Sequence, residues 1–360
     1  MPSSPVTTRP RSRGAQGSRE LRGVQVLRFV TALVVVLSHL TWYLGDRLGA
    51  DLPHPPLGRA AVGTFFAISG FVAVVVTSRH PAPAPGDFVR RRLVRIVPLA
   101  WAFTTVKLVT ALVAPDALSR GGTDPSYVVL SYLFLPARGA DGIVQPLYTV
   151  CWTLSFELLF YVLVAVALLV RRDPVVLVPP VLVLLALGSA VRGEDWPTWA
   201  FYADRLVLCF VVGMLVGRWH RDRDTRSFVG WTGATWAVWL IVTLPTAAPP
   251  LALLLLPVAT IALVGAVALE RPLLHRSPQW LTTLGDASYC LYLAHPVVAP
   301  ATVAVLAVTG LAGPDDAWWC GILAVAASVA ASVVLWKLVD RPLNRWLVRA
   351  TGPRGDTRPH

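Results

Sequence analysis

Long apolar runs separated by short polar segments recur along the whole chain. An α-helix needs about 20 apolar residues to cross a bilayer, and several of these runs, especially the sixth, are shorter. Their number and spacing nevertheless predict an all-α polytopic membrane protein with about ten transmembrane helices. The ten runs cover approximately residues 24–44, 59–78, 96–114, 147–170, 175–191, 206–218, 230–246, 251–269, 284–310 and 317–339. A further apolar segment, 127–135, is too short to cross and is expected to be re-entrant or interfacial.

The distribution of basic residues predicts the orientation of these helices. If both termini are cytoplasmic, most arginines fall in cytoplasmic segments, as the positive-inside rule requires. Six arginines then remain outside: Arg47, Arg59, Arg120, Arg138, Arg192 and Arg205. The formal net charge of +12 therefore belongs to the cytoplasmic face of a multi-pass cell-membrane protein, where anionic lipids or an anionic cytosolic ligand would meet it. Since no folded basic domain is evident, a nucleic-acid partner is not expected.

The amino-acid composition narrows the class of protein further. Hydrophobic residues make up 55% of the chain and charged residues 14%, which is unlike an ordinary soluble domain. Residues 1–22 are rich in Pro, Ser and Arg and are predicted to be a disordered basic cytoplasmic tail. The four cysteines show no CxxC pair or histidine spacing suited to a metal, so we expect neither a metal site nor a disulfide. No repeat or matched pair of broken helices, as in many transporters, is apparent.

The first apolar run carries two unusual residues, Arg28 near its start and His39 well inside. At 1.5 Å per residue, eleven residues separate them by about 16 Å, so His39 is expected near mid-bilayer when Arg28 lies at one interface. An ionisable side chain at that depth is costly and is a candidate for function. The alternative is a histidine that only links two helices by hydrogen bonds.

Two further runs place polar groups inside the membrane. The second contains Ser69, at a depth similar to that of His39, beside Gly63 and Gly70, which are expected to let another helix approach closely. The fourth contains Glu157, the only acidic residue embedded in an apolar run. Structural roles remain open for both: packing for Ser69, and for Glu157 an ion pair with a buried Arg or Lys107.

A run of arginines precedes the third apolar run, in the segment Phe88–Pro98. We interpret it as a cytoplasmic loop in which Arg92 and Arg95, one helical turn apart, offer forked donors to a phosphate. Pro98 is expected at the start of the following helix, whose free N–H groups would add to anion binding. The alternative is a simple topology determinant that contacts lipid phosphates.

The ninth run opens with a polar stripe formed by Tyr289, Tyr292 and His295, each three residues from the next. Such spacing places the three side chains on one side of a helix, and His295 is expected at the depth of His39. The stripe is interpreted as the lining of a cavity, although both tyrosines could merely be wall aromatics. The last run ends at Asp340 and Pro342, read as a helix end with a proline stop and an aspartate paired with a nearby arginine.

Taken in order, these motifs resemble the integral-membrane acyltransferase-3 family, which transfers acyl groups, commonly acetyl, to sugar hydroxyls of polysaccharides and to some antibiotics. The motifs that carry the resemblance are Gln25-x-x-Arg28 with His39, Phe65-Phe66-x-x-Ser69-Gly70-Phe71, Arg92-x-x-Arg95, Trp152-Thr153-Leu154-Ser155-x-Glu157, and Ser288-Tyr289-x-Leu291-Tyr292-Leu293-x-His295-Pro296. The chain departs from the family pattern at Gln25, where many members have Asp, at Asp340, where Glu is usual, and at Leu158-Leu159, which replace a frequent polar pair.

The resemblance implies a membrane acyltransferase domain over residues 23–342, followed by a cytoplasmic C-terminal tail, 343–360. It implies His39 as the essential histidine, Glu157 in support of it, and Arg92 and Arg95 at an acyl-CoA site, with Arg28 assigned to the same site. Acyl transfer to a hydroxyl needs a base, to which neutral imidazole is matched, and donors for the developing oxyanion. Candidates for oxyanion or substrate contacts, unranked, are Ser69, Tyr289, Tyr292 and His295.

The predicted function is therefore that of an O-acyltransferase. It would move an acyl group, expected to be acetyl, from cytosolic acyl-CoA to a hydroxyl of a sugar, cell-envelope polysaccharide or macrolide-type acceptor. Direct transfer and an acyl-histidine intermediate both remain open. The main alternative is a proton-coupled transporter or exporter of a glycan or lipid-linked intermediate, in which His39, Glu157 and His295 relay protons. A scaffold subunit of an envelope complex is the third.

Overall fold

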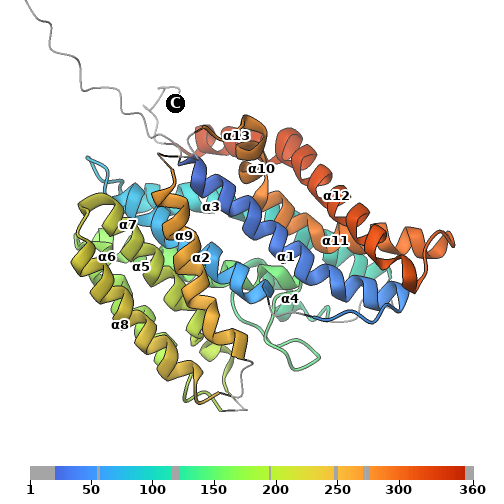
Figure 1. Cartoon of the computed structure of the whole chain (residues 1–360), viewed down its shortest axis with the longest axis horizontal. Helices are drawn as coiled ribbons and strands as arrows, with labels where there is room; N and C mark the ends of the chain where they lie inside the picture. The colour runs from blue at the N-terminus through green and yellow to red at the C-terminus, as the bar shows by residue number, and fades with distance from the viewer. Residues whose placement is uncertain are drawn as a thin grey trace, which may run out of the picture.

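The computed structural model describes residues 21–54, 57–114, 122–193, 196–246, 250–270, 272 and 276–352. These residues form helices and connecting loops, with one isolated β-bridge between Arg138 and Val144 and no strand (Figure 1). In chain order the elements are α1 (Arg22–Leu48), α2 (Leu57–Thr77), α3 (Pro85–Val113), α4 (Pro125–Tyr132), η2 (Thr149–Cys151), α5 (Trp152–Leu169), α6 (Pro174–Gly188), η3 (Thr198–Tyr202), η4 (Arg205–Val207), α7 (Leu208–Asp222), α8 (Thr225–Thr243), η5 (Pro250–Leu254), α9 (Leu255–Ala268), α10 (Gln279–Asp286), α11 (Ser288–Val308), η7 (Pro314–Asp316), α12 (Ala317–Leu335), η8 (Trp336–Asp340) and α13 (Arg341–Thr351).

Each of the ten apolar runs coincides with a helix, so the all-α prediction is confirmed for the described residues. Seven helical segments are long and apolar enough to cross a membrane. They are α1, α2, α3, η2 with α5, η5 with α9, α11, and the continuous stretch from η7 to α13. The helices α6, α7 and α8 fall outside this set, because α6 and α7 have 15 residues each and α8 is less apolar. The short segment predicted not to cross is α4, with eight residues.

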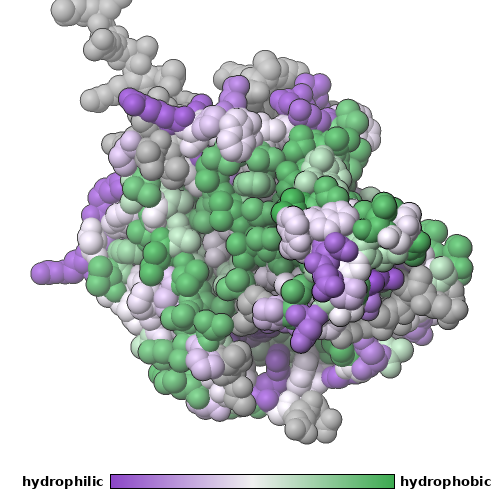
Figure 2. All heavy atoms as spheres, turned by 45° about the vertical axis from the view of Figure 1, so that its right-hand side comes forward, coloured by the Kyte–Doolittle hydropathy of each residue, from purple (hydrophilic) through white to green (hydrophobic). Residues whose placement is uncertain are grey.

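The helices lie side by side in one bundle (Figure 1). In this view α1 runs across the front, α11 and α12 lie to its right, and α5 to α9 lie to its left, while the start of α1, α10 and α13 share the upper end. Figure 2 shows apolar residues over the middle of one face, with hydrophilic residues along the upper edge and towards the lower right. This distribution is that of a protein whose middle is surrounded by lipid.

The closest helix contact joins α2 to α7. A Cβ placed on Gly70 would overlap the carbonyl oxygen of Phe210, and a Cβ on Gly213 would overlap the carbonyl oxygen of Ala67. The two backbones therefore touch, which only glycine allows at these positions. The packing role predicted for Gly70 is confirmed, and this contact fixes the height at which α2 presents its polar residues.

Two predicted helix boundaries are wrong. The arginine segment is not a loop, because α3 begins at Pro85 and continues for 29 residues with Pro98 inside it. The predicted helix N-terminus at Pro98 therefore does not exist, and Arg92 and Arg95 project from the first half of a helix. At the other end of the chain, Pro342 does not stop a helix. The helix α12 passes through a π-helical turn, Trp336–Asp340, into α13. Pro342, which has no backbone N–H group, lies in the first turn of α13.

The chain ends and the cysteines were the remaining subjects of prediction. Residues 1–20 of the expected tail and residues 353–360 lie outside the described residues, and α1 begins at Arg22. Residues 341–351 of the C-terminal region form α13. All four cysteines are free and buried, as expected for small apolar residues.

Candidate active site

Two histidines meet in the interior between α1 and α11. The ring centroids of His39 and His295 are 5.1 Å apart. His39 is half-buried, whereas His295 has no exposed surface. The two residues predicted from separate helices to lie at one depth therefore lie together.

Each of these imidazoles is held by its own helix. His39 Nδ1 is 2.9 Å from the carbonyl oxygen of Val35, and His295 Nδ1 is 3.2 Å from that of Leu291. Since a carbonyl oxygen can only accept, each Nδ1 carries the proton in a neutral ring, and each Nε2 presents a lone pair. The Nε2 atom of His295 is buried and has no hydrogen-bond partner among the described residues, so the site contains an unsatisfied proton acceptor next to the ring of His39.

The tyrosines of the α11 stripe connect this helix to its neighbours. Tyr292 donates its phenol proton to the carbonyl of Val150 at 2.7 Å, and its oxygen lies 2.9 Å from Thr153 Oγ1. Tyr289 donates to the carbonyl of Ile96 on α3 at 2.7 Å. Both phenol protons, which were candidates for oxyanion contacts, are thus committed to backbone carbonyls. These bonds fix the polar stripe of α11 against α3 and the start of α5.

Glu157 lies in a second polar cluster. Ser69 Oγ donates to Glu157 Oε1 at 2.7 Å, and the Tyr161 hydroxyl donates to the same oxygen. Among the described residues no hydrogen bond or ion pair joins Glu157 to His39, whose Nδ1 is occupied by its own helix. Ser69, predicted to be a packing residue or a substrate contact, is a partner of Glu157.

Arg92 links this cluster to the upper end of the molecule. Its guanidinium carbon lies 5.4 Å from the centroid of the Tyr161 ring and 5.5 Å from that of Phe88, distances at which a cation is attracted to an aromatic face. Neither Arg92 nor Arg95 donates a hydrogen bond within the described part of the chain. Because a guanidinium group has five N–H donors, both arginines keep donors for a ligand, and a phosphate fits this donor set.

Arg28, Arg95 and two aspartates form a charge cluster near the same end. Arg28 interacts electrostatically with Arg95, Asp286 and Glu157, and its side chain contacts Gln25 Oε1 at 3.3 Å. Asp340 interacts electrostatically with Arg95 and Arg28.

Asn344 Nδ2 fixes the same aspartate, donating to Asp340 Oδ1 at 2.8 Å. The prediction that Asp340 pairs with a nearby arginine is met only by electrostatic interaction with Arg95 and Arg28, because no ion pair of Asp340 occurs among the described residues. Gln25, which replaces the family's usual Asp, lies beside Arg28.

Sequence reasoning did not single out Tyr161 and Tyr148. Tyr161 follows Glu157 by four residues, the spacing that puts two side chains on one side of a helix, so its contact could have been predicted. Tyr148 donates to the carbonyl of Leu293 from outside any helix, and no sequence spacing indicates this contact. Among the described residues no group of three or more His, Cys, Asp or Glu side chains could hold a metal ion.

Comparison with known families identifies the class of protein to which this bundle belongs. The acyltransferase domain of the acyltransferase-3 family matches residues 21–337. The chain therefore belongs to this family and is a multi-pass membrane acyltransferase.

Two curated proteins are similar to it over most of their length. The exopolysaccharide production protein ExoZ of Rhizobium meliloti (strain 1021) is 30% identical over 304 residues, which cover 81% of this chain and 91% of that protein. Nodulation protein 10 of Rhizobium leguminosarum bv. viciae is 27% identical over 356 residues, covering 88% of this chain and 91% of that protein. No solved structure matches the chain significantly.

Proposed function

We propose that this acyltransferase moves an acetyl group from cytosolic acetyl-CoA to a hydroxyl of a sugar in a cell-envelope polysaccharide. The observation that carries the proposal is the pair of imidazoles, His39 and His295, each with Nδ1 tied to its own helix and Nε2 free to accept a proton. Such a pair is suited to take the proton of an attacking hydroxyl. A glycan acceptor is supported by the similarity to ExoZ, which is named as an exopolysaccharide production protein.

The transfer needs one base and no redox step. The hydroxyl oxygen of the acceptor attacks the thioester carbonyl, the C–S bond breaks, and the acyl group becomes an ester. His39 Nε2 takes the hydroxyl proton, and the resulting imidazolium gives it to the departing thiolate. The buried ring of His295, 5.1 Å away between centroids, stabilises the charged form of His39 in an otherwise apolar interior.

The arginines at the upper end are proposed to hold the donor. Arg92 and Arg95 carry guanidinium donors unused within the described chain, and Arg28, which interacts electrostatically with Arg95, adds positive charge to the same end. A coenzyme A molecule carries several phosphates, which planar guanidinium groups bind in a forked geometry. Glu157 is proposed to keep Arg28 and Arg92 in place rather than to orient His39, since its carboxylate is bound by Ser69 and Tyr161.

This assignment implies an orientation in the membrane. We propose that α6, α7 and α8 cross the bilayer together with the seven longer segments, so that ten helices span it and both termini are cytoplasmic. The start of α1 and helix α13 share one end of the molecule (Figure 1), which is consistent with this proposal. We also propose residues 23–342 as the catalytic domain, flanked by cytoplasmic tails.

The proposal is tested in a strain that lacks the gene. Mass spectrometry of its envelope glycans is expected to show the loss of an ester mass, restored by the native gene and not by His39→Ala. In a purified assay with acetyl-CoA, Arg92→Ala and Arg95→Ala are expected to lower activity at least tenfold, while Arg91→Ala, an exposed neighbour on the same helix, leaves it unchanged. A proton-coupled exporter would instead tolerate the Arg92 and Arg95 changes and lose the whole glycan rather than its ester.

A further inference from the structure

An aromatic and polar cluster lies at the opposite end of α1 from the arginines. The side chain of Trp42 is 56% exposed. The centroid of its ring is 5.9 Å from that of His54, and His54 Nδ1 is 3.0 Å from Thr41 Oγ1. The loop after α1 therefore folds back and holds the tryptophan ring in place.

Trp42 lies on the side of α1 that carries His39. Successive residues turn by about 100°, so Trp42 is about 60° from His39 around the helix but about 140° from Leu37. Val30 and Leu37 are each 47% exposed and mark the outward-facing side of this helix. Along the axis, three residues separate Trp42 from His39 by about 4.5 Å. The exposed ring is thus about one turn beyond the histidine, away from the arginines and on the same side of the helix.

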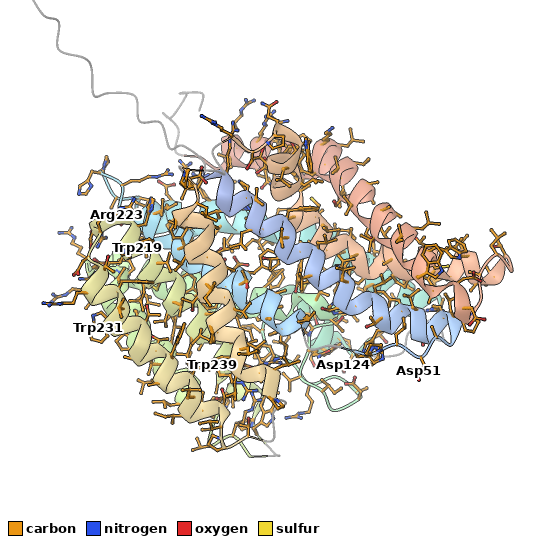
Figure 3. The ribbon with its side chains drawn as sticks, viewed as in Figure 1. Asp51, Asp124, Trp219, Arg223, Trp231 and Trp239 are labelled. Atoms are coloured by element: carbon orange, nitrogen blue, oxygen red, sulfur yellow. The ribbon has the colours of Figure 1, made fainter. Side chains whose placement is uncertain are left out.

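Exposed tryptophans near membrane surfaces are often anchors in the headgroup region, so exposure alone indicates nothing more. Trp199 is such a residue: it is 72% exposed and makes no aromatic or cation–π contact within the described part of the chain. Trp42 differs in having a ring partner and in following His39 by one turn. Figure 3 also places the carboxylate of Asp51, in the loop that carries His54, at this end of α1.

We propose that Trp42 and His54 form the subsite that binds one sugar ring of the acceptor glycan on the non-cytoplasmic side. The apolar C–H face of a pyranose ring packs flat on an indole ring, while its hydroxyl groups need hydrogen-bonding partners at the edge. His54, Thr41 and Asp51 supply such partners. A sugar held on Trp42 presents a hydroxyl towards His39, and the donor reaches the same histidine from the arginine end. This inference rests on the function proposed above.

The test uses the full-length protein in lipid nanodiscs. Polysaccharide from the deletion strain is treated with mild alkali to remove esters, cut into oligosaccharides and offered with radiolabelled acetyl-CoA. Trp42→Ala is expected to raise the KM for the oligosaccharide about three- to tenfold, with the KM for acetyl-CoA unchanged. Trp42→Phe, which keeps an aromatic face, is expected to recover most of the loss, and Trp199→Ala is the matched control.

The outcomes separate the two proposals. If the native protein acylates no oligosaccharide, the proposed function fails and the subsite with it. If the native protein is active and Trp42→Ala changes the KM for the oligosaccharide no more than Trp199→Ala does, the subsite is refuted and the proposed function stands. A parallel rise in both KM values with Trp42→Ala, or a lowered yield of folded protein, would also refute it, because it would indicate a structural role.

Discussion

Removal of the Tyr161 hydroxyl tests whether the carboxylate of Glu157 must be held in place. This hydroxyl is one of two donors to Glu157 Oε1, the other being Ser69 at 2.7 Å, while the face of the same ring lies 5.4 Å from the guanidinium carbon of Arg92. Tyr161→Phe removes the donor and keeps the ring. A hydrogen bond to a charged group is worth about 1.5–3 kcal/mol, so kcat/KM is expected to fall about 10- to 100-fold.

The companion variant Tyr161→Leu removes the ring as well. Arg92 then loses a cation–π contact as well, and the KM for acetyl-CoA is expected to rise further with Tyr161→Leu than with Tyr161→Phe. Steady-state kinetics of the purified protein measures both quantities. Tyr132→Phe is the control, because within the described residues the hydroxyl of Tyr132 forms its hydrogen bond with Thr105 at an exposed position. Equal kinetics for Tyr161→Phe and Tyr132→Phe would refute the idea that Glu157 acts through this contact.

Two further predictions concern packing and the histidine pair. Gly213→Ala is expected to lower the thermal unfolding temperature strongly, since its Cβ would overlap the carbonyl of Ala67. Gly265→Ala is the control, because open space surrounds the added Cβ and the unfolding temperature should not change. Similar unfolding temperatures for the two variants would contradict the backbone contact. His295→Gln is expected to reduce kcat about 100-fold or more with little change in either KM, because the Nε2 lone pair beside His39 is lost. Single-turnover kinetics measures this effect, and an unchanged kcat would remove His295 from the mechanism.

Much of the architecture follows from the apolar pattern, because helix rise is constant. Counting eleven residues from Arg28 to His39, and eleven from the start of the ninth run to His295, predicted the two histidines at one depth, and their rings lie 5.1 Å apart. Ser69 was also expected near the depth of His39, but it binds Glu157 and not the histidine pair. Counting residues along a helix therefore predicts depth, whereas the neighbours of a side chain depend on how the helices pack.

Helix boundaries and partners across the bundle were harder to predict. The arginine segment before Pro98 looked like a loop because it is polar, yet arginine is a good helix former and α3 continues through the proline. The contact of Tyr148 with Leu293 depends on how η2 approaches α11, which no local spacing encodes. Short helices such as α6, with two internal prolines, sit near the limit at which length alone identifies a span.

The contact between α3 and α13 has a practical consequence for handling the protein. Arg90 Nη1 donates to the carbonyl of Val348 at 3.4 Å and to Thr351 Oγ1 at 3.1 Å, so the last described helix braces the segment that presents Arg92 and Arg95. A purification tag attached beyond Gly352 leaves this brace intact. A truncation that deletes residues 341–351 would loosen the donor arginines while every histidine and tyrosine of the interior stays in place, and such a shortened protein would be inactive for a reason unrelated to its catalytic groups.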